Sequence, residues 1–189
     1  LLKRLDRERY NPTVACLLGG GALAEEIKNI NGSVEILHKA DRLDFSVSFK
    51  LAKILKKQKI SLIHTHNTGA YLYGSIAAKL AGVPVIIHTE HGRNFPDKRR
   101  LMITENLLSL FTYKIITVSE DLKASLARFE KINPKKIEVI PNGVDLDLFK
   151  VLSEDIIQQK RYELGLNKDD FIIGNVGRLV EVKDHRNLI

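Results

Sequence analysis

The stretch from Ile60 to Asn94, ISLIHTHNTGAYLYGSIAAKLAGVPVIIHTEHGRN, decides the fold of this 189-residue chain. Its pattern predicts a short apolar strand at 60–63, a helix of small and apolar residues at 69–81, and a second apolar strand at 85–87. Strands that are continuously apolar are typical of parallel sheets buried on both faces, and the helix between them makes a right-handed crossover. The sequence therefore predicts a parallel sheet built around this strand–helix–strand unit.

Polar, titratable residues follow both predicted strands. His64, His66 and Asn67 follow the first strand, and His88 and His91 follow the second. In open α/β sheets, ligands bind outside the carboxyl ends of the strands. We therefore expect His66 and His91 to lie at one edge of the sheet, within one pocket. His91 is the better candidate for contacting a substrate because it lies farthest past its strand, whereas His88 is expected to pack at the strand end.

Strands and helices are predicted to alternate along the rest of the chain. The further strands are expected at 13–18, 33–37, 114–118, 136–140 and 171–176. The further helices are expected at 22–30, 45–58, 97–113, after the N-cap Ser119, at 153–164 and from Asp184. This order indicates an α/β fold with a doubly wound, Rossmann-like parallel sheet. The turn-rich segment 142–154 is the candidate linker, so we expect one domain over 1–150 and the start of a second over 151–189.

Composition and charge narrow the class of protein. The single cysteine, Cys16, excludes a disulfide framework and favours a reducing, cytoplasmic compartment. The net charge of +7 favours anionic partners such as phosphates, nucleotides or the inner face of a membrane. Aromatic residues do not interleave with the basic clusters at 56–59, 98–100 and 135–136, so a nucleic-acid partner is not expected.

A glycine-rich turn, Gly19 to Ala24, follows the first predicted strand and opens a helix. It fits the pattern G-x-G-x-x-A, and Asp41 lies about 20 residues further on, as in dinucleotide-binding proteins. Taken alone, this turn predicts an NAD(P)-dependent oxidoreductase. The alternative is a turn that needs glycine for a positive φ and binds no ligand.

The histidines do not have the pattern of a metal site. No thiolate and no H-E-x-x-H helix accompany them, so no metal is expected. An imidazole at a strand end is instead suited to bind a polar substrate or to carry a proton.

A second anion site is predicted after the strand at 171–176. Gly177 opens a strand-to-helix turn, whose backbone N–H groups can face an anion. Arg178 and Lys183, five residues apart beside this turn, could clamp a diphosphate. The alternative is two solvated cations on a loop.

Several motifs stand in one order along nearly the whole chain: LIHTHN, TEHGRN, ITVSEDLK, VIPNGVDLDLF and GNVGRLVEVKDHRNLI. Together they resemble the retaining GT-B glycosyltransferases of family 4, also called group 1. The pattern PNGVD-x-x-x-F, followed by a strand and GRL-x-x-x-K, is the most specific part. TEHGR is most similar to members that build bacterial exopolysaccharide, lipopolysaccharide or capsule.

The resemblance implies two Rossmann-like domains that face each other across a cleft, the first binding an acceptor and the second a nucleotide-diphosphate-sugar. It implies sugar transfer with retention and without a metal or other cofactor. On this resemblance His91 is the catalytic residue that reaches the transferred sugar, and Gly177, Arg178 and Lys183 bind the donor diphosphate. The residues expected on the acceptor side of the cleft are Gly20, Gly21, His66, Asn67, Arg93 and Asn142.

The sequence departs from the family in two places. The family's first strand is expected before Leu1 and its E-x7-E segment after Ile189, so we expect a fragment that is inactive alone. A sugar or lipid-linked acceptor is the expected second substrate, and the basic surface predicts peripheral contact with anionic lipid. An oxidoreductase that uses Gly19 to Ala24 and a non-catalytic α/β binding domain remain the alternatives.

Overall fold

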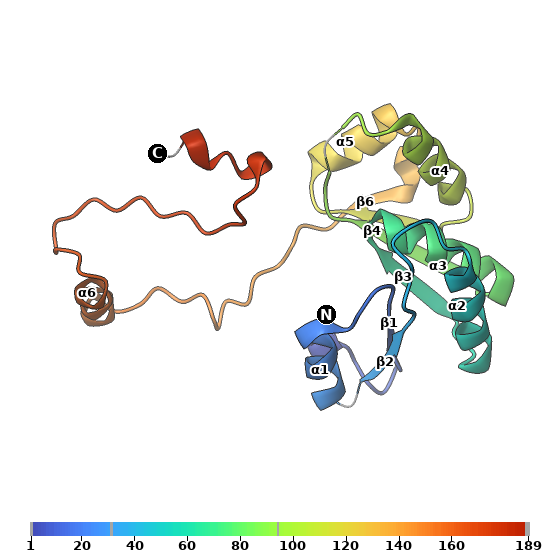
Figure 1. The fold of residues 1–189 in the computed structure, drawn as a ribbon, viewed down its shortest axis with the longest axis horizontal. Helices are drawn as coiled ribbons and strands as arrows, with labels where there is room; N and C mark the ends of the chain where they lie inside the picture. Colours follow the sequence, from blue (N-terminus) through green and yellow to red (C-terminus); the bar gives the residue numbers. More distant parts are fainter. Residues whose placement is uncertain (1, 31, 94, 188–189) are drawn as a thin grey trace. The chain divides into compact units, whose positions relative to one another are not determined.

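A computed structural model describes residues 2–30, 32–93 and 95–187 (Figure 1). The chain divides into two compact units, Leu1–Asn142 and Gly143–Ile189. The division falls at the start of the predicted linker.

The larger unit is built on a parallel sheet of four strands in the order β3-β4-β5-β6. Its strands are β3 (Leu62–His66), β4 (Val85–Glu90), β5 (Lys114–Thr117) and β6 (Ile137–Val139). The helices that connect them in turn are α3 (Asn67–Ala81), α4 (Arg99–Ser109) and α5 (Glu120–Phe129). The predicted strand–helix–strand unit is therefore confirmed as β3, α3 and β4. Gly82, in the left-handed conformation, ends α3.

Two more strands form a separate parallel pair. β1 (Thr13–Cys16) pairs in register with β2 (Ser33–Ile36), and α1 (Gly21–Asn29) connects them. The predicted α/β architecture with parallel strands is confirmed, but the described strands lie in two sheets instead of one, because β1 and β3 share no ladder of backbone hydrogen bonds. The chain returns from β2 to β3 through α2 (Ser46–Lys57).

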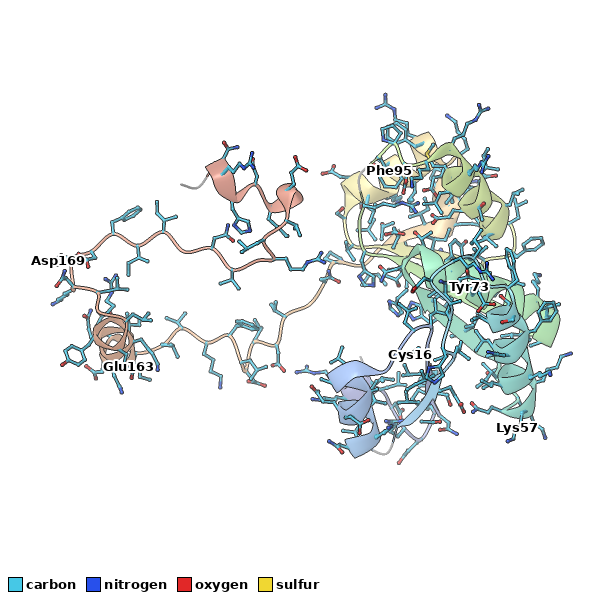
Figure 2. The ribbon with its side chains drawn as sticks, in the orientation of Figure 1. Cys16, Lys57, Tyr73, Phe95, Glu163 and Asp169 are labelled. Carbon is cyan, nitrogen blue, oxygen red and sulfur yellow. The ribbon has the colours of Figure 1, made fainter. Side chains whose placement is uncertain are left out.

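The main core lies between α2, α3 and the sheet (Figure 2). Val47, Leu51 and Leu55 recur at helical spacing on α2 and are buried against α3, where Tyr73 is 2% exposed. Burial of each such side chain contributes about 1.5–3 kcal/mol. A Cβ at Gly74 would meet Thr65 Cγ2 at 2.6 Å, so this glycine lets α3 lie directly on β3. The close packing fixes the position of the β3 end.

The smaller unit contains α6 (Glu154–Glu163) and two short 3-10 turns, η3 (Glu181–Lys183) and η4 (His185–Asn187). The prediction of a strand at 171–176 is wrong for this structure. These residues have no partner strand in the part of the chain that is described, and Phe171 is 91% exposed. A strand depends on hydrogen bonds to a neighbour, which an apolar run cannot supply alone. The helix predicted from Asp184 is only the turn η4, and residues 188–189 lie outside the described residues.

Candidate active site

The structure brings His66 and His91 together. His66 ends β3, and His91 directly follows β4. Nδ1 of His66 lies 2.9 Å from Nε2 of His91, and the two rings are stacked with centroids 5.2 Å apart. The prediction that both histidines share one edge of the sheet is confirmed, but of the two only His91 lines the cavity at this edge. A hydrogen bond between two imidazole nitrogens needs one proton, so one ring donates and the other accepts.

A third histidine extends this pair. The ring of His64 lies 4.3 Å from that of His66, and its Nε2 is hydrogen-bonded to Thr89 Oγ1 at 2.8 Å. Burial, reinforced by the neighbouring histidines, lowers the pKa of His64 to about 4 and also lowers the pKa of His66. These two rings are therefore neutral near pH 7. A neutral imidazole can accept a proton or a hydrogen bond from a hydroxyl group.

His88 is held away from this edge. It is 2% exposed, stacks on Tyr71 with ring centroids 3.8 Å apart, and bonds through Nδ1 to Thr65 Oγ1 at 3.0 Å. The expectation that His88 is packed is confirmed, but His88 lies inside β4 and not at its end.

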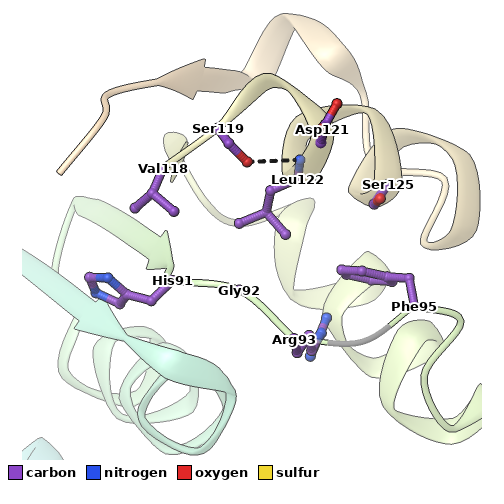
Figure 3. Close-up of a pocket in the computed structure, with 9 residues that line it drawn as sticks. All are labelled: His91, Gly92, Arg93, Phe95, Val118, Ser119, Asp121, Leu122 and Ser125. Carbon is purple, nitrogen blue, oxygen red and sulfur yellow. Dashed lines mark hydrogen bonds between the residues drawn. The ribbon is translucent and has the colours of Figure 1, made fainter. Parts of the chain in front are cut away.

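A cavity of about 250 Å³ lies beside His91, between the loop after β4 and the start of α5 (Figure 3). Its wall combines hydroxyl, carboxylate and imidazole groups with apolar side chains. This mixture is suited to a ligand with several hydroxyl groups and an apolar face, such as a sugar. The lining residues are His91, Gly92, Arg93, Phe95, Val118, Ser119, Asp121, Leu122 and Ser125.

The predicted N-cap forms one corner of the cavity. Ser119 Oγ accepts a hydrogen bond from the backbone N–H of Leu122 at 3.2 Å, as Figure 3 shows. This bond satisfies one of the free N–H groups at the helix start and fixes the entry of the chain into α5.

The Arg93 side chain forms buried ion pairs. Its Nη1 donates to Glu105 Oε1 at 2.7 Å and to Thr68 Oγ1 at 2.8 Å, and its Nη2 donates to both Glu105 and Glu130. The Arg93 side chain is only 13% exposed, and its Nε lies 3.6 Å from Asp97 Oδ2. Sequence analysis placed Arg93 in the cleft, and the structure places it at the cavity wall with its charge already partnered.

The loop that carries His91 is held at both ends. Before His91, Glu90 Oε1 accepts a hydrogen bond from the N–H of Gly92 at 3.1 Å. After it, Arg93 is fixed by Glu105 and Glu130. Sequence reasoning missed Glu105 and Glu130. Glu105 did give a signal, because it is a charged residue inside the apolar repeat of the helix predicted at 97–113.

The glycine-rich turn is explained by packing. A Cβ at Gly20 would meet Ala24 Cβ at 2.6 Å and Ile36 Cδ1 at 3.3 Å, and Gly21 has a φ of +57°. Glycine is therefore needed so that α1 can lie against β2, whether or not a ligand binds. Asn67 also has a positive φ of 66°, at the point where β3 turns into α3.

The remaining predicted residues are not among those that line this cavity. Asn142 is exposed at the end of the larger unit. In the smaller unit Gly177, Arg178 and Lys183 lie on an exposed turn. The backbone carbonyl of Arg178 accepts a hydrogen bond from His185 Nε2 at 2.9 Å, and Arg178 is exposed. Within the described residues, no group of three or more His, Cys, Asp or Glu side chains could hold a metal ion.

Comparison with known proteins identifies the family. Residues 1–148 match the sequence model of Glycosyltransferase Family 4. The chain belongs to glycosyltransferase family 4. Over 143 residues it is 36% identical to the UDP-Gal:alpha-D-GlcNAc-diphosphoundecaprenol alpha-1,3-galactosyltransferase of Escherichia coli, a match that covers 72% of the chain and 36% of that protein.

Other family relatives cover more of the chain. The putative glycosyltransferase EpsF of Bacillus subtilis is 28% identical over 177 residues, which is 89% of the chain and 46% of EpsF. The chain thus spans less than half the length of these two relatives. Among solved structures, Anabaena Alr3699/HepE in complex with UDP-glucose has a TM-score of 0.66 at 22% identity, covering 81% of the chain and 42% of HepE. This likeness supports the fold.

Proposed function

We propose that the protein containing this chain transfers a sugar, with retention, from a nucleotide-diphosphate-sugar to a sugar or lipid-linked acceptor in bacterial polysaccharide synthesis. The observation that carries the proposal is the hydrogen-bonded pair His66–His91 beside a sugar-sized cavity, in the part of the chain that matches the family. Relatives named for capsular polysaccharide biosynthesis and for transfer to a diphosphoundecaprenol-linked sugar support the polysaccharide role.

In this proposal His91 is the catalytic contact. It binds the transferred sugar, while His66 fixes its ring through the shared hydrogen bond. The bond from the anomeric carbon to the diphosphate breaks, and the acceptor oxygen bonds to the same face of the sugar. The acceptor proton passes to the departing diphosphate. The sugar gains positive character in this step, so a polar, partly dry environment favours it.

The donor diphosphate is assigned to the smaller unit. Gly177, Arg178 and Lys183 stand where the family resemblance puts the diphosphate contacts, and both cations are exposed and available to an anion. Arg178 can bind two phosphate oxygens with its planar fork, and Lys183 acts as a point charge. Together they offset the negative charge that grows on the leaving group, so the proposed reaction does not require a metal.

The acceptor side is assigned to the larger unit. The cavity beside His91 takes the acceptor sugar, and Gly20, Gly21 and Asn67 are proposed to shape the same side of the site. A lipid-linked acceptor would place the protein at the cytoplasmic face of a membrane. Within the described residues, none of the helices has the length and apolarity needed to cross a bilayer.

The test is transfer by the intact protein. A panel of nucleotide-diphosphate-sugars is incubated with a lipid-diphosphate-sugar acceptor, and nucleoside diphosphate release and product anomer are followed by NMR. We expect one donor to be consumed only when acceptor is present, with retained configuration. Failure of every donor, or reduction of NAD(P) by the protein, would contradict the proposal.

A further inference from the structure

Helix α4 presents an apolar face outward. Ile103, Leu107, Leu110 and Phe111 recur at helical spacing along α4 and its end, and they are 51%, 54%, 64% and 55% exposed. The buried residues of α4 are Glu105 and Ser109, on its opposite face. Leu101, Met102 and Leu108 are half-buried, so apolar side chains lie on both faces of α4, whereas an ordinary surface helix turns a polar face outward.

The end of α3 continues this surface. Leu80 is 43% exposed, and Lys79 Nζ lies 4.5 Å from the ring centroid of Phe111. We call Leu80, Ile103, Leu107, Leu110 and Phe111 the α4 face. Large exposed apolar patches on soluble proteins mark interaction sites.

The charges around the α4 face are positive. Lys98, Arg99 and Arg100 are exposed at the start of α4, and Lys79 borders Phe111. Between Lys98 and Tyr113 the sequence holds a single carboxylate, Glu105. That carboxylate is 3% exposed and paired with Arg93, so it does not offset the outer cations.

We propose that the α4 face docks on an anionic lipid bilayer. An apolar helix face rimmed by cations binds at the lipid interface, where the side chains enter the acyl boundary and each nearby cation contributes about 1 kcal/mol. A symmetric contact with a second copy would bring two sets of these cations together, which disfavours self-association. The charge complementarity therefore selects anionic lipid as the occupant.

Docking would also orient the candidate active site. Glu105 holds Arg93 from the inner side of α4, and Arg93 belongs to the loop that carries His91. One rigid helix thus connects the proposed bilayer surface to the catalytic loop. The docking surface is separate from the sugar chemistry and does not depend on it.

The first test is co-sedimentation of the intact protein with vesicles of phosphatidylglycerol or of phosphatidylcholine. We expect binding to phosphatidylglycerol alone, weakening as salt rises. Two double variants, Leu107→Gln with Leu110→Gln and Arg99→Gln with Arg100→Gln, should each weaken binding about tenfold or more. Matched controls away from the face, Leu23→Gln with Leu43→Gln and Lys56→Gln with Lys57→Gln, should bind as the unmodified protein does.

A second readout measures insertion directly. These 189 residues contain no tryptophan, so Leu107→Trp adds a reporter on the α4 face, with Leu23→Trp as its control and the unmodified protein as the baseline. We expect the tryptophan fluorescence emission to shift to shorter wavelength on lipid binding, and to be quenched by brominated lipid, for Leu107→Trp only. Unchanged lipid binding in the leucine double variant would overturn the proposal. The proposal would also be overturned if the unmodified protein did not bind lipid but formed a dimer, and if the leucine double variant dissociated that dimer. Transfer to a water-soluble acceptor should persist in both α4 variants, which separates docking from catalysis.

Discussion

At the scale of single residues, several groups in and beside the candidate site have pKa values that are shifted from their usual range. Burial lowers the pKa of His64 and of His66; His66 adds to the effect on His64, and His91 adds to the effect on His66. The pKa of Glu130 is shifted upward. Burial and the neighbouring Glu105 raise it to about 8, although Arg93 opposes this shift. The sequence shows the histidines as a pattern after two strands. It does not show Glu130, whose partners Arg93 and Glu105 are 37 and 25 residues distant in the chain.

Glu130 makes stability depend on pH. The folded protein keeps this proton up to about pH 8, whereas the unfolded chain loses it near 4.5, so the folded state binds more protons between these values. The stability that Glu130 contributes is full below about pH 4.5 and is lost as pH rises through 8. We expect the free energy of unfolding of the unmodified protein to fall relative to that of Glu130→Gln across this window.

Urea unfolding at intervals from about pH 5 to pH 9 measures this difference. Glu163→Gln, at an exposed position of α6, serves as the control and should follow the unmodified protein. A constant offset between Glu130→Gln and the unmodified protein at every pH would contradict the assignment.

At the scale of elements, one arginine ties three segments together. Arg93 follows β4, Glu105 belongs to α4, and Glu130 caps the end of α5. The strands and helices that carry these residues follow from apolar periodicity, and for that reason β3, α3 and β4 were predicted in the right order, although each strand runs three residues past its predicted end, into the polar residues. Their mutual contacts are not encoded in any local pattern. The strand expected at 171–176 failed for a related reason, since an apolar run specifies a strand only when a neighbour supplies the hydrogen bonds.

Arg93→Ala tests this connection. The variant leaves Glu105 buried without its cation, and it leaves Glu130, which keeps its proton near pH 7, without its hydrogen-bond donor; at pH 7 the free energy of unfolding should fall by about 3–5 kcal/mol. Arg93→Lys should recover only part of the loss, because lysine cannot make the two-pronged contact with Glu105. Thermal and urea unfolding measure both variants, with the exposed Arg99→Ala as a near-neutral control. A loss under about 1 kcal/mol in Arg93→Ala would show that the ion pairs add little.

At the scale of the whole molecule, the family and the α/β class could be predicted from five ordered motifs. The larger unit is the better determined by sequence, because residues 1–148 match the family. The outward apolar face of α4 could not be predicted in this way. Periodicity identifies an apolar stripe, but only the structure shows that this stripe points to solvent.

Arg178 and Lys183 carry the prediction for the donor side. In the intact protein, Arg178→Ala and Lys183→Ala should each lower kcat by roughly ten- to a thousandfold, with a smaller effect on donor KM, because the diphosphate gains charge as it leaves. Arg178→Lys should restore only part of the rate. Steady-state kinetics measure these variants against Lys168→Ala, an exposed control in the same unit. If both alanine variants turned over at a rate close to that of the control, the assignment of Arg178 and Lys183 to the donor diphosphate would be contradicted.

The central claim is that sugar transfer takes place at the His66–His91 edge. The most direct measurement is the steady-state rate of His91→Ala in the intact protein, with its donor and acceptor at saturation and His38→Asn as a histidine control outside the cluster. The account predicts a loss in kcat of about a hundredfold or more for His91→Ala, on the scale of a lost catalytic hydrogen-bonding group, and an unchanged rate for the control. A His91→Ala rate within about twofold of the unmodified protein, too little for any catalytic contact, would contradict it.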